Sequence, residues 1–202
     1  MDDFLFPSNN EWDIPTLKED LQLDLVAMPL ESWGAVSRGA FMPGTFNFYV
    51  EDYRFSALWK HPEQLFDTQC YGVIEPNYST SDVLPLALGI GLIYRKRWLA
   101  RYWQTRGVKV AVDMWVSRKY FEHNLIGVPR GWRSYATRGN VVVDFVRDAY
   151  NLACKHAGTD DIVFIVYGGT KEMREFCASY GILWFPDTAN VRNGAAKEYG
   201  AI

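Results

Sequence analysis

Short apolar runs alternate with helical patterns along most of this chain, and this alternation restricts the fold more than any other feature. Segments 46–50, 71–74, 108–115, 160–167 and 183–185 are rich in β-branched and aromatic residues. Glu, Asp, Gly or Pro residues follow them, as expected where a strand ends. Strands separated by helical patterns are typical of an α/β protein with a parallel sheet.

The segments between the later strands have helical patterns. The longest runs from about residue 83 or 85 to Thr105, where Pro85 suits the first turn and Gly107 closes the helix. A second helix is predicted over 140–155. A third is predicted from Thr170, a capping residue, to Tyr180. The apolar stripe of the longest helix includes Leu88, Leu92, Leu99 and Trp103, a weaker strand is predicted over 133–137, and an interrupted helix over 56–66.

The number and length of these units favour a small or incomplete (β/α) barrel. An open parallel-sheet α/β fold is the alternative, and the polar and aromatic strand ends favour the barrel. We predict an irregular N-terminal leader over 1–24, a single α/β domain over 25–187 and a polar, mobile C-terminal tail over 188–202. In both architectures ligands bind at the carboxyl ends of the strands.

Composition excludes several classes of protein. Of 202 residues, 49% are hydrophobic and 22% charged, which is too apolar for a disordered chain. A net charge of −3 excludes a uniformly basic nucleic-acid coat but not a local basic face. The longest apolar stretch, 83–94, is short of the roughly 20 residues of a membrane span. With no signal peptide and no C-x-x-C pair among three cysteines, we expect a cytoplasmic protein with reduced thiols and no membrane partner.

Charged residues at the predicted strand ends form the candidate site. Asp52, Glu75 and Asp113 are predicted to converge, and three carboxylates suit Mg²⁺ or Mn²⁺. Such an ion would activate water against a phosphate that Arg138 steadies. Alternatively, one carboxylate with a raised pKa acts as an acid while another stays ionised. The remaining interpretation is structural: these groups cap helices and pair with arginines such as Arg54.

Further residues at the same edge are predicted to line a ligand site: Asn77, Trp115, Tyr167 and Gly168. Gly168 and Gly169 precede a helix, whose N-terminus attracts anions. The segment is neither G-x-G-x-x-G nor a P-loop. A tight strand-to-helix turn is therefore the favoured interpretation.

Basic and aromatic residues interleave between residues 94 and 103, within the longest predicted helix. Such a segment can bind phosphates and stack on bases, so it is the candidate nucleic-acid contact. At helical spacing, however, Trp98 and Tyr102 share a face, which indicates core packing instead. The candidate contacts are Arg95, Lys96, Arg97 and Arg101.

Several motifs in a fixed order resemble the DUF4417 family. They are Asp52-Tyr53-Arg54-Phe55, Pro76-Asn77-Tyr78-Ser79, Arg97-Trp98-Leu99, Tyr102-Trp103-Gln104 and Gly127-Val128-Pro129. The resemblance covers residues 33 to 186 and implies a setting in a bacteriophage or another mobile element, with no established reaction. This chain has Asn77 where the family pattern commonly has aspartate, so a metal or proton role there would need Glu75 as a substitute.

These features predict a phage-encoded protein in nucleic-acid transactions, acting in the host cytoplasm. The leading hypothesis is a DNA-binding, metal-assisted phosphoryl-transfer or hydrolytic enzyme, with nucleic acid or a phosphorylated small molecule as its partner. The alternative is a non-catalytic module that sequesters a small ligand or docks on a host or phage protein. The oligomeric state stays open.

Overall fold

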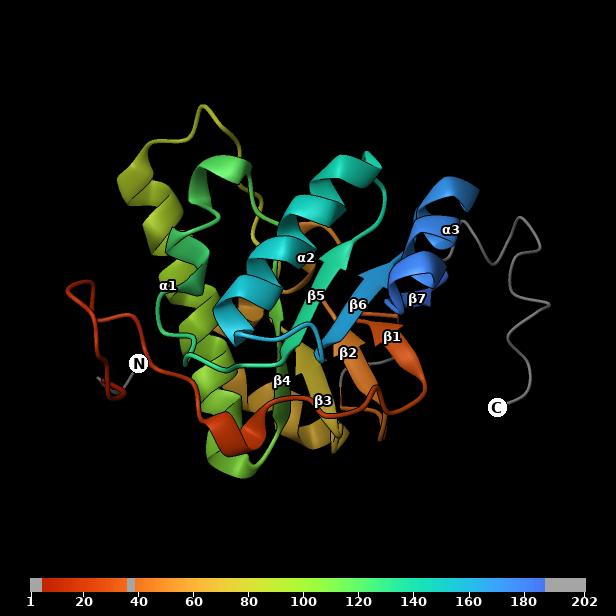
Figure 1. Cartoon of the computed structure of the whole chain (residues 1–202). Coiled ribbons are helices and arrows are strands. Elements are labelled where there is room, and N and C mark those ends of the chain that lie inside the picture. The colour runs from red at the N-terminus through yellow and green to blue at the C-terminus, as the bar shows by residue number, and fades with distance from the viewer. Residues whose placement is uncertain (1–4, 36–38, 188–202) are drawn as a thin grey trace.

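Seven parallel strands form one sheet whose spatial order equals their order along the chain (Figure 1). The computed structural model describes residues 5–35 and 39–187, so the predicted tail over 188–202 lies outside the described residues. The strands are β1 (Leu30–Ser32), β2 (Thr45–Asn47), β3 (Gly72–Ile74), β4 (Lys109–Asp113), β5 (Ser134–Arg138), β6 (Val163–Tyr167) and β7 (Leu183–Phe185).

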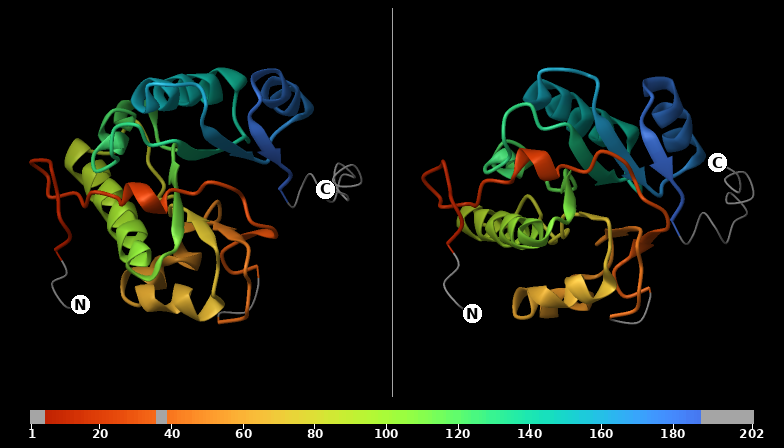
Figure 2. Two further views of the ribbon diagram at one scale, coloured as in Figure 1. Left: turned by 60° about the horizontal axis from the view of Figure 1, so that its bottom comes forward. Right: turned by 90° about the horizontal axis from the view of Figure 1, so that it is seen from below.

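The sheet curls into an incomplete barrel (Figure 2). Ser32 Oγ of β1 lies 3.4 Å from the hydroxyl of Tyr167 in β6. Tyr49, just after β2, stacks on the Tyr167 ring with the ring centroids 5.9 Å apart. Strands that are four or five places apart in the sheet therefore face each other across its concave side. The predicted α/β, incomplete barrel-like fold is confirmed.

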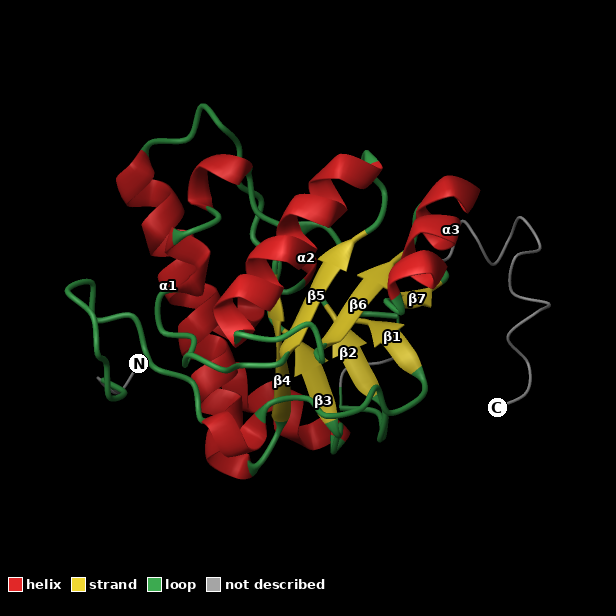
Figure 3. Ribbon diagram, viewed as in Figure 1, coloured by secondary structure: helices red, strands yellow, loops and turns green. Residues whose placement is uncertain are grey.

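Helices cover the convex side of the sheet (Figure 3). Thr170 caps the third α-helix as predicted, because its side chain accepts a hydrogen bond from the Met173 N–H. The α-helices are α1 (Leu86–Trp103), α2 (Val143–Ala157) and α3 (Lys171–Tyr180). The short 3-10 helices are η1 (Glu19–Leu21), η2 (Asp52–Arg54), η3 (Ser56–Trp59), η4 (Pro62–Thr68), η5 (Gln104–Arg106), η6 (Arg118–Tyr120) and η7 (His123–Leu125).

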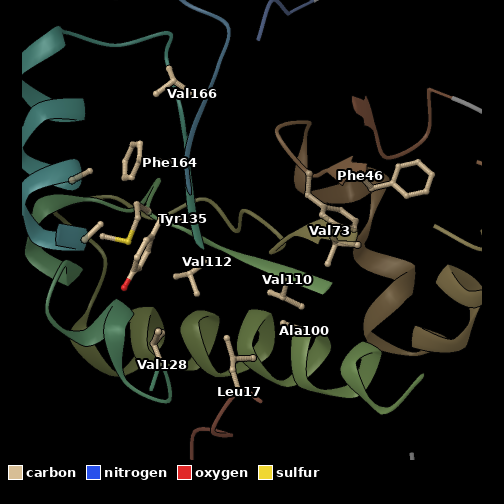
Figure 4. Packing of buried hydrophobic residues seen from close by; sticks show 14 of the residues in the cluster. Leu17, Phe46, Val73, Ala100, Val110, Val112, Val128, Tyr135, Phe164 and Val166 are labelled. Atoms are coloured by element: carbon tan, nitrogen blue, oxygen red, sulfur yellow. The ribbon is translucent and has the colours of Figure 1, made fainter. Parts of the chain in front are cut away.

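The core fills the space between the sheet and these helices. Figure 4 shows Val110 and Val112 of β4 on the side that faces α1, where Ala100 lies. Between the two valines, Ala111 points to the concave side, as strand alternation requires, and joins a smaller apolar cluster there. Thus β4 separates two packed layers.

Local structure departs from the sequence predictions in three places. Residues 56–66 form 3-10 helices instead of an interrupted α-helix. Leu88 of the predicted apolar stripe is exposed, because the first turns of α1 extend beyond the sheet. β1 was not predicted, since its sequence Leu-Glu-Ser has no apolar run. Within the described residues, none of the helices is long and apolar enough to cross a membrane.

Candidate functional site

Four charged side chains are buried together at the carboxyl ends of β3 and β4. We call Glu75, Asp113, Lys96 and Arg97 the charge cluster; each is at most 2% exposed. Glu75 follows β3 and Asp113 ends β4, while α1 supplies Lys96 and Arg97 from consecutive positions. Arg97 Nη1 donates to Glu75 Oε1 at 2.5 Å, and Lys96 Nζ donates to Asp113 Oδ2 at 3.3 Å. Two anions and two cations therefore compensate one another inside the protein.

Burial and pairing act in opposite directions on these groups. Burial raises the pKa of Glu75 and lowers the pKa of Arg97, while the attraction between the two charges opposes both changes. Additional hydrogen bonds support the charged forms, since Arg97 Nη2 donates to the Asn124 carbonyl at 2.6 Å and Lys96 Nζ to the Asp113 carbonyl at 2.8 Å. The cluster is built as a structural ion-pair network.

Asp113 has a donor at every side of its carboxylate. Oδ1 accepts hydrogen bonds from the Tyr49 hydroxyl at 3.1 Å and the Trp115 N–H at 3.0 Å. Oδ2 accepts from Asn77 Nδ2 at 3.1 Å and from Lys96. A carboxylate has about four acceptor positions, so this one is saturated. Burial and the Asp113 charge together raise the pKa of Tyr49 well above 10, which keeps its hydroxyl a donor.

Asp52 is not part of this cluster. Its carboxylate oxygens accept hydrogen bonds from the Ser79 hydroxyl at 3.0 Å and the Ser79 N–H at 3.1 Å, near the protein surface. The described residues contain no group of three or more His, Cys, Asp or Glu side chains that could hold a metal ion. Because Lys96 and Arg97 neutralise Glu75 and Asp113, the predicted carboxylates do not fit Mg²⁺ or Mn²⁺ in this arrangement.

A second polar group lines the concave side at the same edge of the sheet. We call Ser32, Asn47, Tyr49, Arg138 and Tyr167 the barrel mouth. Arg138 ends β5 and lies in register with Tyr167 of β6. Strand alternation directs it to the concave side, and its side chain is half-buried. Across the described residues, no hydrogen bond or ion pair engages its guanidinium group.

Asn47 adds a second donor without a partner to the barrel mouth. Its Oδ1 accepts hydrogen bonds from Ser32 Oγ at 3.0 Å and the Tyr49 N–H at 3.1 Å. Its Nδ2 is completely buried and has no partner among the described residues. The positive charge of Arg138 also reaches Tyr49, where it acts to lower the pKa of the hydroxyl. The mouth therefore presents donors and a positive charge, which is an arrangement that favours an anion.

Glycines allow the loops beside the mouth to touch. A Cβ atom at Gly139 would lie 2.2 Å from the Gly168 carbonyl oxygen, and one at Gly169 would lie 2.5 Å from the Gly139 oxygen. Gly168 has a φ of +77°, and its N–H donates to the Phe185 carbonyl at 2.8 Å. The predicted tight strand-to-helix turn is confirmed. The Gly168 N–H donates to Phe185 within the fold, so it is not a free donor for a ligand, and Gly168 could contact one only through its other atoms.

The basic residues of α1 divide between the core and the surface. Lys96 and Arg97 are buried in the charge cluster, where they pair with Asp113 and Glu75, so their predicted contact with nucleic acid stays a prediction. Arg95 is exposed and lies 5.3 Å from the centre of the Trp59 ring, and Arg101 lies over Phe6. The core interpretation of the helix aromatics is confirmed, because Trp98 is buried; it stacks against the partly buried Tyr102 ring.

Sequence reasoning missed three residues of the barrel mouth: Ser32, Asn47 and Tyr49. Asn47 and Tyr49 alternate with Phe46 and Phe48, and both phenylalanines are buried on the helix-covered side. Two polar groups at a spacing of two residues, next to an apolar set, indicate a polar concave face. This alternation could have predicted Asn47 and Tyr49 from the sequence. No comparable pattern surrounds Ser32, which lies in the unpredicted strand β1.

Comparison with known proteins relates the chain to bacteriophages. The Gene 1 proteins of Mycobacterium phage D29 and of Mycobacterium phage L5 are each 30% identical to it over 132 residues, which is 62% of this chain. The match covers 48% and 56% of those two proteins, so the chain spans about half the length of the curated relatives it matches. No solved structure matches it. Residues 6–175 match the domain of unknown function DUF4417, and the chain therefore belongs to this family.

Proposed function

We propose that this phage-related protein binds a phosphorylated ligand at the barrel mouth, in the nucleotide or nucleic-acid transactions of a phage. The observation that carries the proposal is Arg138, a half-buried guanidinium at a strand end with no partner among the described residues. Burying a charge without a partner is costly, and a phosphate would supply the missing one through paired N–H···O bonds. Asn47 Nδ2, buried in the same barrel mouth, is a second, neutral donor without a partner among the described residues.

The groups around Arg138 do not neutralise it. Tyr49 stays protonated at neutral pH, because its pKa is raised well above 10. Asp113, one hydrogen bond beyond Tyr49, is already paired with Lys96. Arg97 gives the contrast, since its guanidinium group has a carboxylate partner, Glu75, at 2.5 Å. The charge on Arg138 is thus available to a ligand, whereas the charge on Arg97 is not.

Binding receives more support than metal-assisted phosphoryl transfer or hydrolysis. The three carboxylates of the predicted metal site have other partners: Ser79 for Asp52, Arg97 for Glu75, and Lys96 with Asn77 for Asp113. An added divalent cation would have to displace a buried ammonium or guanidinium group. We therefore favour the non-catalytic form of the hypothesis, in which the protein binds or sequesters its ligand.

Isothermal titration of the purified protein with inorganic phosphate and with pyrophosphate tests this function. We expect saturable binding that weakens with salt, and an affinity at least tenfold lower for Arg138→Gln. Arg133→Gln is the matched control, because Arg133 immediately precedes the same strand and is exposed beside Asp161. If Arg138→Gln binds as tightly as Arg133→Gln, or if the wild-type protein binds neither anion, the proposal is wrong.

The nucleic-acid form of the proposal has its own measurement. Arg95 and Arg101 are the predicted contacts that are not part of the buried charge cluster. If the mouth holds a terminal phosphate of DNA, binding of a 5′-phosphorylated single-stranded oligonucleotide depends on Arg138 and on that phosphate. If α1 is the contact, Arg95→Gln combined with Arg101→Gln weakens binding of phosphorylated and unphosphorylated strands equally, and the mouth is not the nucleic-acid site.

A further inference from the structure

A cavity of about 350 Å³ lies beside the barrel mouth, between the loop after β3 and the residues after β4. Its volume is at the lower end of the range for small-molecule sites, about 300 to 1,000 Å³. One wall consists of polar side chains and the other is aromatic. The lining residues are Ser79, Thr80, Ser81, Asp82, Trp115, Val116, Ser117 and Phe145.

Hydrogen bonds hold the polar wall in place. Thr80 Oγ1 accepts from the Ser117 N–H at 2.9 Å, and the Ser117 hydroxyl donates to Asp82 Oδ1. Lys119 Nζ donates to the Asp82 carbonyl at 3.1 Å. In the described part of the chain nothing donates to Asp82 Oδ2. The wall therefore offers a positioned carboxylate oxygen that can accept a hydrogen bond from a ligand.

The aromatic wall is also fixed. Trp115 and Phe145 meet edge to face, with ring centroids 4.9 Å apart. Asn77 Nδ2 donates to the Trp115 carbonyl at 2.7 Å and so ties this residue to the Asp113 network. Trp115 also packs against the concave apolar cluster that contains Tyr167. It therefore stands between the cavity and the barrel mouth.

We infer that this cavity holds the nucleoside part of a nucleotide whose phosphate lies at the barrel mouth. The inference rests on the proposed function and adds the class of ligand. A flat base fits against Trp115 and Phe145, because aromatic faces attract each other when stacked or edge to face. The N–H or O–H groups of a nucleoside can donate to Asp82 Oδ2, which is exposed at the cavity and accepts no hydrogen bond from the described residues. A ligand with both parts bridges the two sites across Trp115.

Titration calorimetry with three groups of probes tests the inference: inorganic phosphate, ribose 5-phosphate, and the monophosphates AMP, GMP, CMP and UMP. We expect at least one nucleoside monophosphate to bind ten or more times tighter than ribose 5-phosphate and phosphate. In Trp115→Leu that advantage is lost while phosphate binding persists. Asp82→Asn, an exposed substitution, reduces the same advantage at least threefold. Trp12→Leu is the matched control, because Trp12 is an exposed tryptophan of the leader.

The outcomes separate the two proposals. If every nucleoside monophosphate binds no tighter than ribose 5-phosphate, the nucleoside inference is wrong and the phosphate site stands. If nucleotides bind but phosphate does not, and Arg138→Gln has no effect while Trp115→Leu abolishes binding, the cavity stands and the barrel mouth proposal is wrong. If the wild-type protein binds none of these probes, both proposals are wrong. Melting temperatures of the variants confirm that each one is folded.

Discussion

The charge cluster and the barrel mouth lie at the same edge of one sheet and use charge in different ways. In the cluster, Glu75 and Arg97 are buried and lie within 2.5 Å of each other. In the mouth, Arg138 has no such partner among the described residues. The difference shows that a charged residue at a strand end does not by itself mark a binding site. What marks one is a buried or half-buried polar group whose partner the protein does not supply.

The two regions differ because of the helix that covers each strand. α1 packs on the convex side of β3 and β4, and its consecutive residues Lys96 and Arg97 reach the carboxylates at the ends of these strands. Strand alternation points Arg138 to the concave side of β5, whereas the α-helices of the described residues lie on the convex side (Figure 3). The charge at a strand end is therefore compensated where a side chain of α1 reaches it, as Lys96 reaches Asp113, and stays open at Arg138, which no charged side chain of the described residues pairs with.

Breaking the charge cluster should have the largest effect. Arg97→Leu removes the close partner of the buried Glu75 and leaves only Lys96, at 4.0 Å, to pair with it, which costs about 3–5 kcal/mol of unfolding free energy. Urea denaturation followed by circular dichroism measures it. Arg95→Leu, two residues earlier and exposed, is the control, with a change within about 0.5 kcal/mol.

The double variant Glu75→Leu with Arg97→Leu should recover much of this loss, because it removes both charges. A loss below about 1 kcal/mol for Arg97→Leu alone would contradict the assignment of the cluster as a stabilising network.

Tyr49 connects the two regions, and its hydroxyl should have the next largest effect. Tyr49→Phe removes a buried hydrogen bond to the Asp113 carboxylate, which contributes about 1.5–3 kcal/mol for a charged acceptor. Tyr167→Phe is the control, since its hydroxyl only meets Ser32 Oγ at 3.4 Å. The loss of stability is measured by thermal unfolding. Equal losses in the two variants would show that the hydrogen bond to Asp113 stabilises the fold no more than the contact with Ser32.

An exposed ion pair should contribute less to the free energy of unfolding than the buried groups. Lys109 donates to Asp24 at 2.5 Å on the surface, and hydrogen bonds from Lys109 and Tyr71 lower the pKa of Asp24 from 3.8 to about 2. A carboxyl with a lowered pKa adds stability above its unfolded pKa and loses it as the pH falls through the folded value. Asp24→Asn should therefore cost less than about 1 kcal/mol at pH 7. The cost should disappear near pH 2, as measured by unfolding at both pH values.

Arg138→Gln should have the smallest effect on the unliganded protein, within about 0.5 kcal/mol, because no internal partner is lost. The contrast with Arg97 appears when phosphate is added. Wild-type protein should gain about 2.7 kcal/mol at a phosphate concentration one hundred times its Kd, and the variant, which binds at least tenfold more weakly, should gain no more than about 1.4 kcal/mol at that concentration. A large loss of stability without ligand would mean that Arg138 has a structural partner after all.

Most of the fold could be predicted from local sequence, and only part of the site could. Apolar runs such as 160–167 predicted their strands because buried parallel strands need such residues on both faces. Arg138 and Tyr167 were predicted at one edge, and the structure places them in register. The burial of Lys96 and Arg97 could not be predicted, because it depends on which carboxylates α1 crosses. Helical spacing alone does not contain that information.

The strictly sequential order of the sheet has a consequence for how the protein is made. Each strand from β2 to β7 pairs with the strand that precedes it in the chain. No strand has to be inserted between two that are already paired. As the chain leaves the ribosome, the sheet can therefore grow from one edge in the order of translation. Each new strand pairs with the strand made just before it.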